Sequence, residues 1–321
     1  MLDDGIPARG ERLRGGALRE AMLRLREEEK LRARDAATRL GVSEAEFVAA
    51  KVGHEAIRLQ PDFADILRAL SGVGEVLALT RNEHCVHEKH GTFEAVAIEG
   101  QTGSVRDGGG LELQLFLSRW HHAYKLTDEG EMGMIMTSLQ FFDADGTAVH
   151  KVYLTENSDR DAFDAIVGRF MHAEQSNELD VTPDAPSPDT TPPAEGTHTR
   201  VAPGALRVAL EKAAETGAPI SVVVGNPGAI QIHTGPISKV MATGPWYNIL
   251  DPRFNMHLHE AAVDGAWVVR EPSADGVVTS LELIDATGRS IVQISGERSP
   301  GKPQSPAWRA IVDSLPLSHA A

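Results

Sequence analysis

The chain has 321 residues, of which 41% are hydrophobic and 24% charged, a size typical of about two soluble domains. Its 31 Lys and Arg against 46 Asp and Glu give a net charge of −15, which disfavours nucleic acid and anionic membranes as partners. The single cysteine, Cys85, excludes an internal disulfide framework. With no secretory signal and no long apolar run in the sequence, we expect a cytoplasmic protein without membrane insertion.

Residues 1–74 predict an N-terminal helical region, because apolar residues recur at helical spacing among charges. Ser43 and Glu46 form a capping box, so we expect a helix to begin near residue 44. The segment 36–52, with Gly41 to Ser43 between two short helices, resembles a helix-turn-helix. It supports a DNA-binding hypothesis that the net charge opposes.

Residues 75–171 change to β-branched runs and predict a first β-rich repeat, closed by a helix over 159–171 with Ser158 as its cap. Residues 172–203 contain six prolines and predict a solvated linker. Residues 204–321 predict a second repeat, in which a helix near 204–216 precedes the strands. Ser305 as cap and Pro306 at the first helical position predict the last helix.

The two β-rich stretches are copies of each other. Residues 137–146 (TSLQFFDADG) match 279–288 (TSLELIDATG) at an offset of 142, and residues 82–91 match 226–235 at 144. Such steady offsets indicate homologous halves. We therefore predict an α+β fold of two repeats, each a large antiparallel sheet with flanking helices, related by a pseudo-twofold axis. A ligand between the two halves would follow naturally.

Several motifs resemble the HemS/ChuS/HmuS family of bacterial cytoplasmic hemin-handling proteins, over roughly residues 32 to 315. They are Arg81-Asn82-Glu83, Val86-His87-Glu88, Ser138 to Asp143, His150 to Tyr153, Val224-Gly225-Asn226 and Thr279 to Leu283. The resemblance implies heme held between two repeats, and heme transfer or ring-opening degradation as the activity. It also implies a heme-uptake transporter or an electron donor as partners.

The pocket departs from this family at several positions. Relatives carry the iron-ligating histidine in a Trp-Arg-x-Met-Thr-x-x-His-Gln-Phe context, which this sequence lacks. Gln114 stands where the family has a distal Arg, Glu271 and Ser295 replace a pocket Lys and Tyr, and Arg298 is kept. The resemblance thus implies a b-type heme with weak or altered ligation, and Lys to Glu reverses the charge that meets the propionates.

Three histidines are candidate iron ligands, because imidazole is an axial ligand of heme iron. His87 matches a family segment that also has His, and its alternative role is that of an ordinary sheet histidine. His198 is near the missing ligand segment but within the predicted linker. His257 and His259 share one strand face, with His257 at the repeat equivalent of Gln114; the alternative is a partly exposed polar face.

Other chemistry finds less support. His84, His87 and His90 beside Cys85 have spacing that a strand cannot bring to one zinc ion. The common nucleotide, zinc-protease and hydrolase motifs are absent from the sequence. The leading hypothesis is heme binding and handling, with enzymatic activity left open. A non-catalytic scaffold for another apolar ligand or a protein partner is second, and DNA-binding regulation is third.

Overall fold

The structure is a computed structural model that describes residues 12–29, 31, 33–129, 133–183, 197–202, 204–298, 301 and 303–318. The chain divides into two compact units, Met1–Val76 with Phe116–Ala185 and Leu77–Leu115 with Pro186–Ala321. We call them unit 1 and unit 2 and describe each by itself. No helix of the described residues is long and apolar enough to cross a membrane.

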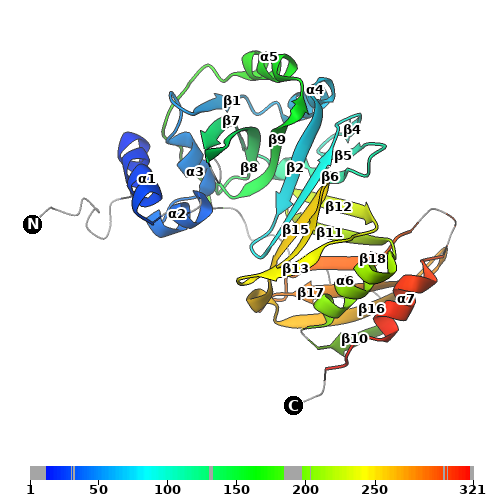
Figure 1. Cartoon of the computed structure of the whole chain (residues 1–321). Coiled ribbons are helices and arrows are strands. Elements are labelled where there is room, and N and C mark those ends of the chain that lie inside the picture. Colours follow the sequence, from blue (N-terminus) through cyan, green and yellow to red (C-terminus); the bar gives the residue numbers. More distant parts are fainter. Residues whose placement is uncertain are drawn as a thin grey trace, which may run out of the picture. The chain divides into compact units, whose positions relative to one another are not determined.

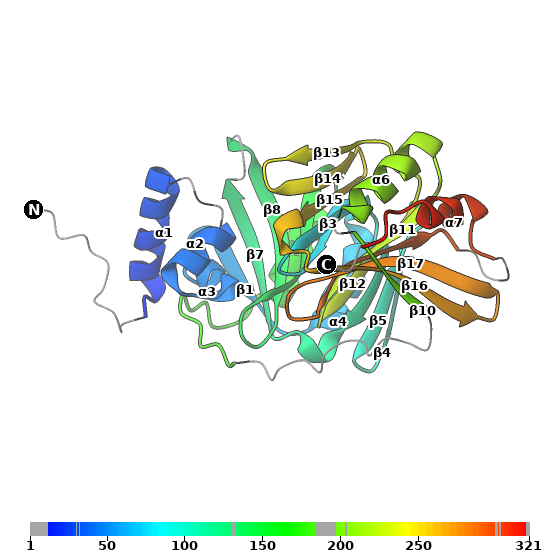
Figure 2. The same cartoon turned by 90° about the horizontal axis from the view of Figure 1, so that it is seen from below.

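The helices of unit 1 gather at the N-terminus and beside its sheet (Figures 1 and 2). They are α1 (Gly15–Glu29), α2 (Ala33–Leu40), α3 (Glu44–Ala49), α4 (Phe63–Ala69), the short η1 (Leu70–Gly72) and η2 (Leu117–Arg119), and α5 (Arg160–Phe170). Unit 2 contains α6 (Ala205–Thr216), the short η4 (Glu260–Ala262) and α7 (Pro306–Asp313).

The strands belong to two antiparallel sheets of nine strands each. Unit 1 contains β1 (Ala56–Leu59), β7 (His122–Glu129), β8 (Ile135–Phe142) and β9 (Ala148–Ser158), neighbours in that order, and the division between the units falls within β2 (Gly74–Arg81). In unit 2 one sheet has the order β3 (Cys85–Gly91), β15 (Phe254–His259), β14 (Trp246–Asp251), β13 (Val240–Thr243). The other has the order β10 (Thr197–Val201), β16 (Gly265–Ser273), β17 (Gly276–Ile284), β18 (Ser290–Gly296), β11 (Ile220–Asn226), β12 (Ala229–Gly235), β6 (Glu112–Phe116), β5 (Thr102–Arg106), β4 (Ala95–Glu99).

The two predicted copies form equivalent hairpins, which confirms the two-repeat fold. The β8–β9 hairpin has a bulge between Phe141 and Phe142, and the β17–β18 hairpin has one between Leu283 and Ile284, 142 residues later. The turns match as well: Asp143 Oδ1 accepts a bond from the Thr147 amide, and Asp285 Oδ1 accepts one from the Arg289 amide. The two stretches therefore fold in the same way.

A reciprocal pair of asparagines joins the repeats inside unit 2. Asn82 Nδ2 donates to the Gly225 carbonyl, at 3.2 Å, and Asn226 Nδ2 donates to the Arg81 carbonyl, at 2.8 Å. Each Oδ1 also accepts two backbone amides of its own turn. Because the two residues are repeat equivalents, this exchange of bonds is what a pseudo-twofold relation predicts.

The strand membership of the sheets corrects one expectation, that each repeat forms its sheet from its own strands alone. β6 of the first repeat pairs with β12 of the second, Leu115 opposite Ala229. In the same way β15 of the second pairs with β3 of the first, Phe254 opposite Lys89. Each repeat thus lends three strands to the sheet of the other, because the edges of β3 and β12 expose backbone groups that need partners.

The predicted helix caps were correct in position more often than in the residue that makes the capping hydrogen bond. The capping box of α3 is complete, with Ser43 Oγ accepting from the Glu46 amide and the Glu46 carboxylate accepting from the Ser43 amide. The cap of α5 is Asp159, not Ser158, whose hydroxyl instead donates to the Glu75 carbonyl. Ser305 does precede Pro306 at the start of α7, but its side chain makes no capping bond.

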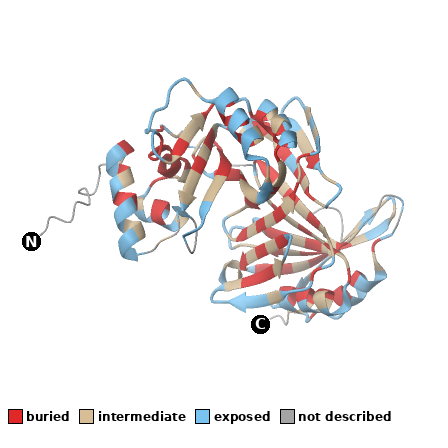
Figure 3. Ribbon diagram, turned by 45° about the horizontal axis from the view of Figure 1, so that its top comes forward, coloured by how far each residue is buried: buried red, intermediate tan, exposed pale blue. Residues whose placement is uncertain are grey.

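The largest hydrophobic core lies in unit 2. Buried side chains of α6, α7 and the strands beneath them pack with those of β14 and β15, including Tyr247, Met256, Leu281 and Trp308. Figure 3 shows many buried positions along α6, α7 and the strands beside them, which Figure 1 labels. A smaller core in unit 1 joins α3 to β7, where Ala45, Val48 and Ala49 cover Tyr124. The helical expectation for residues 1–74 misses β1, whose residues pair with β7. Residues 184–196 and 203, which include five of the six prolines of the predicted linker, lie outside the described residues.

Candidate functional site

One face of the β10–β16–β17–β18–β11–β12–β6 sheet packs against α6 and α7, and the other carries mostly polar or partly exposed residues, with Val269 and Ser280 buried among them. We call this second face the open face. Strand alternation and register place on it one set of side chains from seven strands. The set comprises His198, Arg200, Trp267, Val269, Glu271, Ser280, Glu282, Gln293, Ser295, Ser221, Val223, Ile230, Ile232 and Gln114.

A fixed carboxylate lies near the middle of the open face. Glu282 is opposite Trp267 on β16 and Gln293 on β18. Its Oε1 accepts a hydrogen bond from Ser280 Oγ at 3.0 Å and another from Gln293 Nε2 at 2.8 Å. Two donors on one oxygen hold the carboxylate in place, so the face presents a negative charge beside an aromatic ring.

Two of the five predicted site residues lie on the open face. Gln114 is exposed on β6, opposite Ile230, and His198 is exposed on β10, opposite Val269. Arg298 follows the end of β18, where its guanidinium donates to Ser273 Oγ at 3.4 Å. Gln114, His198 and Arg298 thus belong to one sheet or its end, although Gln114 and His198 lie on strands near opposite sides of that sheet.

His257 lies on the other sheet of unit 2, with Met256 and Leu258 buried on the opposite face of β15 as alternation predicts. Asn248 Nδ2 donates to the Met241 carbonyl, so its Oδ1 faces His257 Nδ1, at 2.8 Å. The ring therefore carries its proton on Nδ1. His257 Nε2 lies 4.0 Å from a carboxylate oxygen of Glu88.

His87 is fully buried in unit 2, in a stack of rings. Its ring centroid lies 4.8 Å from that of Phe254, and the other side of Phe254 stacks on His233 at 3.8 Å. Lys89 Nζ donates to His233 Nδ1 at 3.0 Å. Within the described part of the chain, neither ring nitrogen of His87 has a hydrogen-bond partner. No heme could reach this imidazole without unpacking the core.

Burial sets the protonation of this ring stack. It lowers the pKa of His87 well below the usual value, and the nearby charges of His233 and Lys89 add to the effect. Burial followed by the Lys89 charge lowers the pKa of His233 to about 3. Both imidazoles are therefore neutral at physiological pH.

The remaining metal and thiol candidates separate in space. Cys85 is buried, and burial raises the pKa of its thiol far above the usual value, so the thiol is inert. His84 points to a different environment, with Nε2 3.8 Å from Asp285 Oδ2. Among the described residues no three His, Cys, Asp or Glu side chains converge as a metal site would require.

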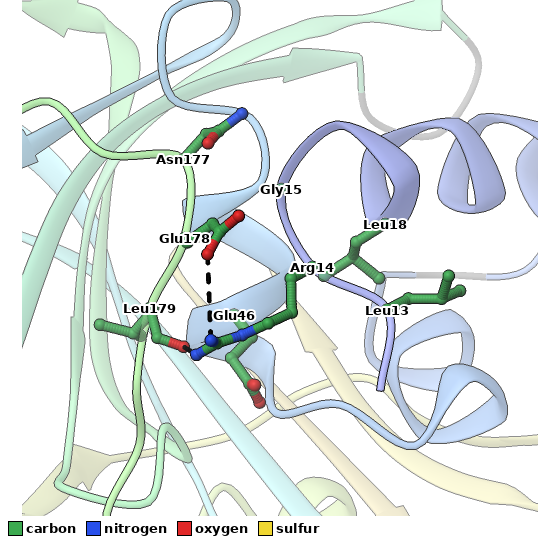
Figure 4. Close-up of a pocket in the computed structure, with 8 residues that line it drawn as sticks. All are labelled: Leu13, Arg14, Gly15, Leu18, Glu46, Asn177, Glu178 and Leu179. Atoms are coloured by element: carbon green, nitrogen blue, oxygen red, sulfur yellow. Dashed lines mark hydrogen bonds and ion pairs between the residues drawn. The ribbon is translucent and has the colours of Figure 1, made fainter. Parts of the chain in front are cut away.

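Two cavities lined by described residues are too small or too shallow for a heme. In unit 1, Arg14 reaches from the start of α1 to the Leu179 carbonyl and to Glu178, and the space around it has a volume of about 10 Å³ (Figure 4), room for one water. In unit 2 a shallow hollow of about 250 Å³ lies between η4 and the turn at Asp285.

Comparisons with known proteins place this architecture. The model of the haemin-degrading HemS.ChuX domain matches twice, over residues 41–170 and 192–315. The hemin transport protein HmuS of Yersinia pestis is 38% identical across 88% of this chain and 92% of its own length. HemS of Yersinia enterocolitica, also a hemin transport protein, is 36% identical across 86% and 90%.

Solved structures agree. Holo-PhuS, a heme-binding protein from Pseudomonas aeruginosa, superposes with a TM-score of 0.87 at 39% identity, over 94% of this chain and 99% of that one. ChuS, an E. coli heme oxygenase, gives 0.83 at 34%, over 93% and 99%. This chain therefore belongs to the family of the HemS.ChuX domain. The recognition from motifs and the two-repeat fold are both confirmed.

Sequence reasoning missed Trp267 and Arg200 as candidate site residues. They are direct neighbours across β10 and β16 on the open face. The signal was available in part, since Trp267 alternates with the apolar Ala266 and Val268. The pairing of Trp267 with Arg200 was not predicted, because residues 172–203 were interpreted as a linker and strand β10 was therefore not expected.

Proposed function

We propose that this chain binds heme as cargo on the open face of unit 2 and hands it on within the cytoplasm, with His198 as the axial iron ligand. The observation that carries this is an exposed imidazole, His198, on the same sheet face as Ser295, which lies three strands away. The relatives, named as hemin transport and heme-binding proteins, support heme as the cargo.

The residue types on the open face match the chemical groups of a heme. Imidazole is a common axial ligand, and the two propionates need cations or hydrogen-bond donors. Arg200 supplies positive charge on this face and Arg298 supplies it just beyond the end of β18, Ser295 supplies a hydrogen-bonding group, and Trp267 supplies an aromatic surface. Glu271 and Glu282 add negative charge to the same face, so the affinity for a dianionic ligand should fall below that of relatives with Lys at the Glu271 position.

Transfer is the better-supported activity of this chain than ring opening. Gln114, which stands where the family has a distal Arg, carries no charge with which to stabilise a developing anion, and it lies six strands from His198, too far to contact a ligand bound there. Ring opening would appear as progressive loss of the Soret band when a reductant is added to the hemin complex in air, since dioxygen is the oxidant that the reaction consumes. Persistence of the band would assign the chain to binding and transfer.

The test is a hemin titration of the whole chain followed by Soret absorbance. We expect saturable binding, and we expect His198→Ala to shift the band and weaken binding by roughly tenfold or more, as loss of an axial ligand should. His87→Gln is the matched control, because a fully buried imidazole should leave the spectrum unchanged. A spectrum that changes in the His87 variant and not in the His198 variant would reverse the assignment.

A scaffold that binds a different ligand is the second candidate, and the carboxylates of Glu271 and Glu282 favour it. Absence of a Soret shift with hemin would support it. DNA binding is opposed by the structure of the helix pair at residues 36–52. Five of the six residues of α3 are buried, and Glu44 pairs with Lys151, so the recognition position has no free face for a groove.

A further inference from the structure

The indole of Trp267 on the open face fills the space that Gly265 leaves free. A Cβ placed on Gly265, two residues earlier on the same strand face, would lie 3.1 Å from the indole Nε1 and 3.0 Å from Ile284. The indole therefore leans back along β16 over the glycine, and a larger residue there would push it away. In the first repeat the equivalent positions are His122 and Tyr124, and Tyr124 is covered by α3.

A cation stands beside this ring. Arg200 is opposite Trp267 across β10 and β16, and its guanidinium carbon lies 5.8 Å from the ring centroid. Among the described residues Arg200 forms no ion pair, and its side chain is exposed. His198 lies two residues earlier on the same strand face. An aromatic surface, a cation and an imidazole thus lie together at one edge of the open face.

We propose that Trp267 is the surface on which a tetrapyrrole ring stacks and that Arg200 binds one of its propionates. Stacking needs a flat apolar surface, which the indole of Trp267 provides. A propionate of the stacked tetrapyrrole needs a cation beside the indole, and Arg200 provides it. This assignment rests on the proposed heme function and adds two positioning residues to it. It requires no iron, which separates it from the role proposed for His198.

The test compares three ligands on the full chain: hemin, metal-free protoporphyrin IX and the dimethyl ester of protoporphyrin IX. Trp267→Leu should weaken all three by roughly tenfold. Arg200→Gln should weaken the two free acids by roughly three- to fivefold, as expected for an exposed ion pair, and leave the ester unchanged. His198→Ala should weaken hemin alone.

Matched controls come from elsewhere in the chain. Arg58 stands opposite Tyr124 as Arg200 stands opposite Trp267, so Arg58→Gln removes an equivalent charge from the first repeat and should leave all three affinities unchanged. Trp246→Leu removes a partly exposed indole from the other sheet, with the same expectation. Gly265→Ala keeps Trp267 but displaces it, and should reproduce part of the loss; thermal melting shows that each variant is folded.

The outcomes separate the two proposals. Wild-type binding of hemin with unchanged affinities in the Trp267 and Arg200 variants would overturn the stacking assignment and leave the heme function standing. Binding of metal-free protoporphyrin that depends on Trp267, without binding of hemin, would do the reverse. If the Arg200 variant lost the ester as strongly as the free acids, the propionate role would be wrong.

Discussion

The same sheet face has different neighbours in the two repeats. In the first repeat Tyr124 and Phe142 lie beneath α3 and are fully buried, in contact with Val48, Ala49 and the residues around them. In the second repeat the equivalent positions are Trp267 and Ile284, which are partly exposed. The other face is covered in both repeats, by α4 and α5 or by α6 and α7.

This difference indicates how a duplicated fold can acquire a site. The N-terminal helices cover one copy of the face and convert it into core, and the copy without such a cover keeps its aromatic residue at the surface. The polar residues follow the same division: Lys151 in the first repeat pairs with Glu44 of α3, whereas its equivalent Gln293 supports Glu282 on the open face. The covered face contributes stability, and the open face is available for a ligand.

The largest effect should come from truncating the covered face. Phe142→Ala should lower the free energy of unfolding by about 3–5 kcal/mol, because it removes a fully buried ring and leaves a cavity. Ile284→Ala, the equivalent truncation, should cost less than about 1.5 kcal/mol, because water already reaches the site. Urea unfolding measures both, and equal costs would mean that the second face is not open.

The ring stack in unit 2 should make the protein sensitive to acid. His87 and His233 are neutral when folded, whereas in the unfolded chain they gain protons below pH 6.5, so stability should fall as the pH drops from about 6.5 toward 3. Each buried imidazole should contribute a loss of up to about 1.4 kcal/mol per pH unit. Urea midpoints at pH 7 and pH 4.5 report this loss.

His87 in the first repeat can be replaced by the residue type found at the equivalent position of the second repeat. Its repeat equivalent is Gln231, whose side chain donates to the Ala78 carbonyl at 2.9 Å. His87→Gln should reduce the loss between pH 6.5 and 4.5 by about 2 kcal/mol, since one titrating group is removed. The same acid loss in the variant and the wild type would show that His87 is not neutral in the fold.

The smallest effect concerns the helix caps. Ser43→Ala should cost about 1 kcal/mol, because the hydroxyl and Glu46 together satisfy two backbone donors at the start of α3. Ser305→Ala should be nearly neutral, because Ser305 makes no side-chain capping bond at α7. Thermal melting of the two variants is sufficient, and a larger shift for the Ser305 variant would contradict the assignment of the caps.

The sequence predicted the features that local patterns encode. The Ser43–Glu46 spacing located α3, the repeat offsets located equivalent hairpins, and motifs over most of the chain identified the family. It did not predict that β6 and β15 cross to the other repeat's sheet, because both pairings satisfy the same alternation of apolar residues. The sequence also did not predict that His87 is buried, because its polar neighbours in sequence are typical of a strand at the surface.

The candidate site was predictable in its chemistry and less so in its position. Gln114 was identified from a family position and His198 from its nearness in sequence to the missing ligand segment, and both lie on the open face, whereas His257 lies on the other sheet. Arg200 and Trp267 could be paired only once β10 was known to be a strand. A short edge strand after a proline-rich segment carries too few residues for its periodicity to be recognised.

The exchanged strands have a consequence for synthesis of the protein. Leu115 on β6 pairs with Ala229 on β12, and Lys89 on β3 pairs with Phe254 on β15. Neither sheet can therefore be completed while the ribosome is still synthesising the first repeat. The emerging chain must hold several unpaired strand edges until most of the message has been translated, a period in which aggregation competes with folding. A truncated product ending before β12 would keep those edges permanently, and we expect it to be degraded or to require a chaperone.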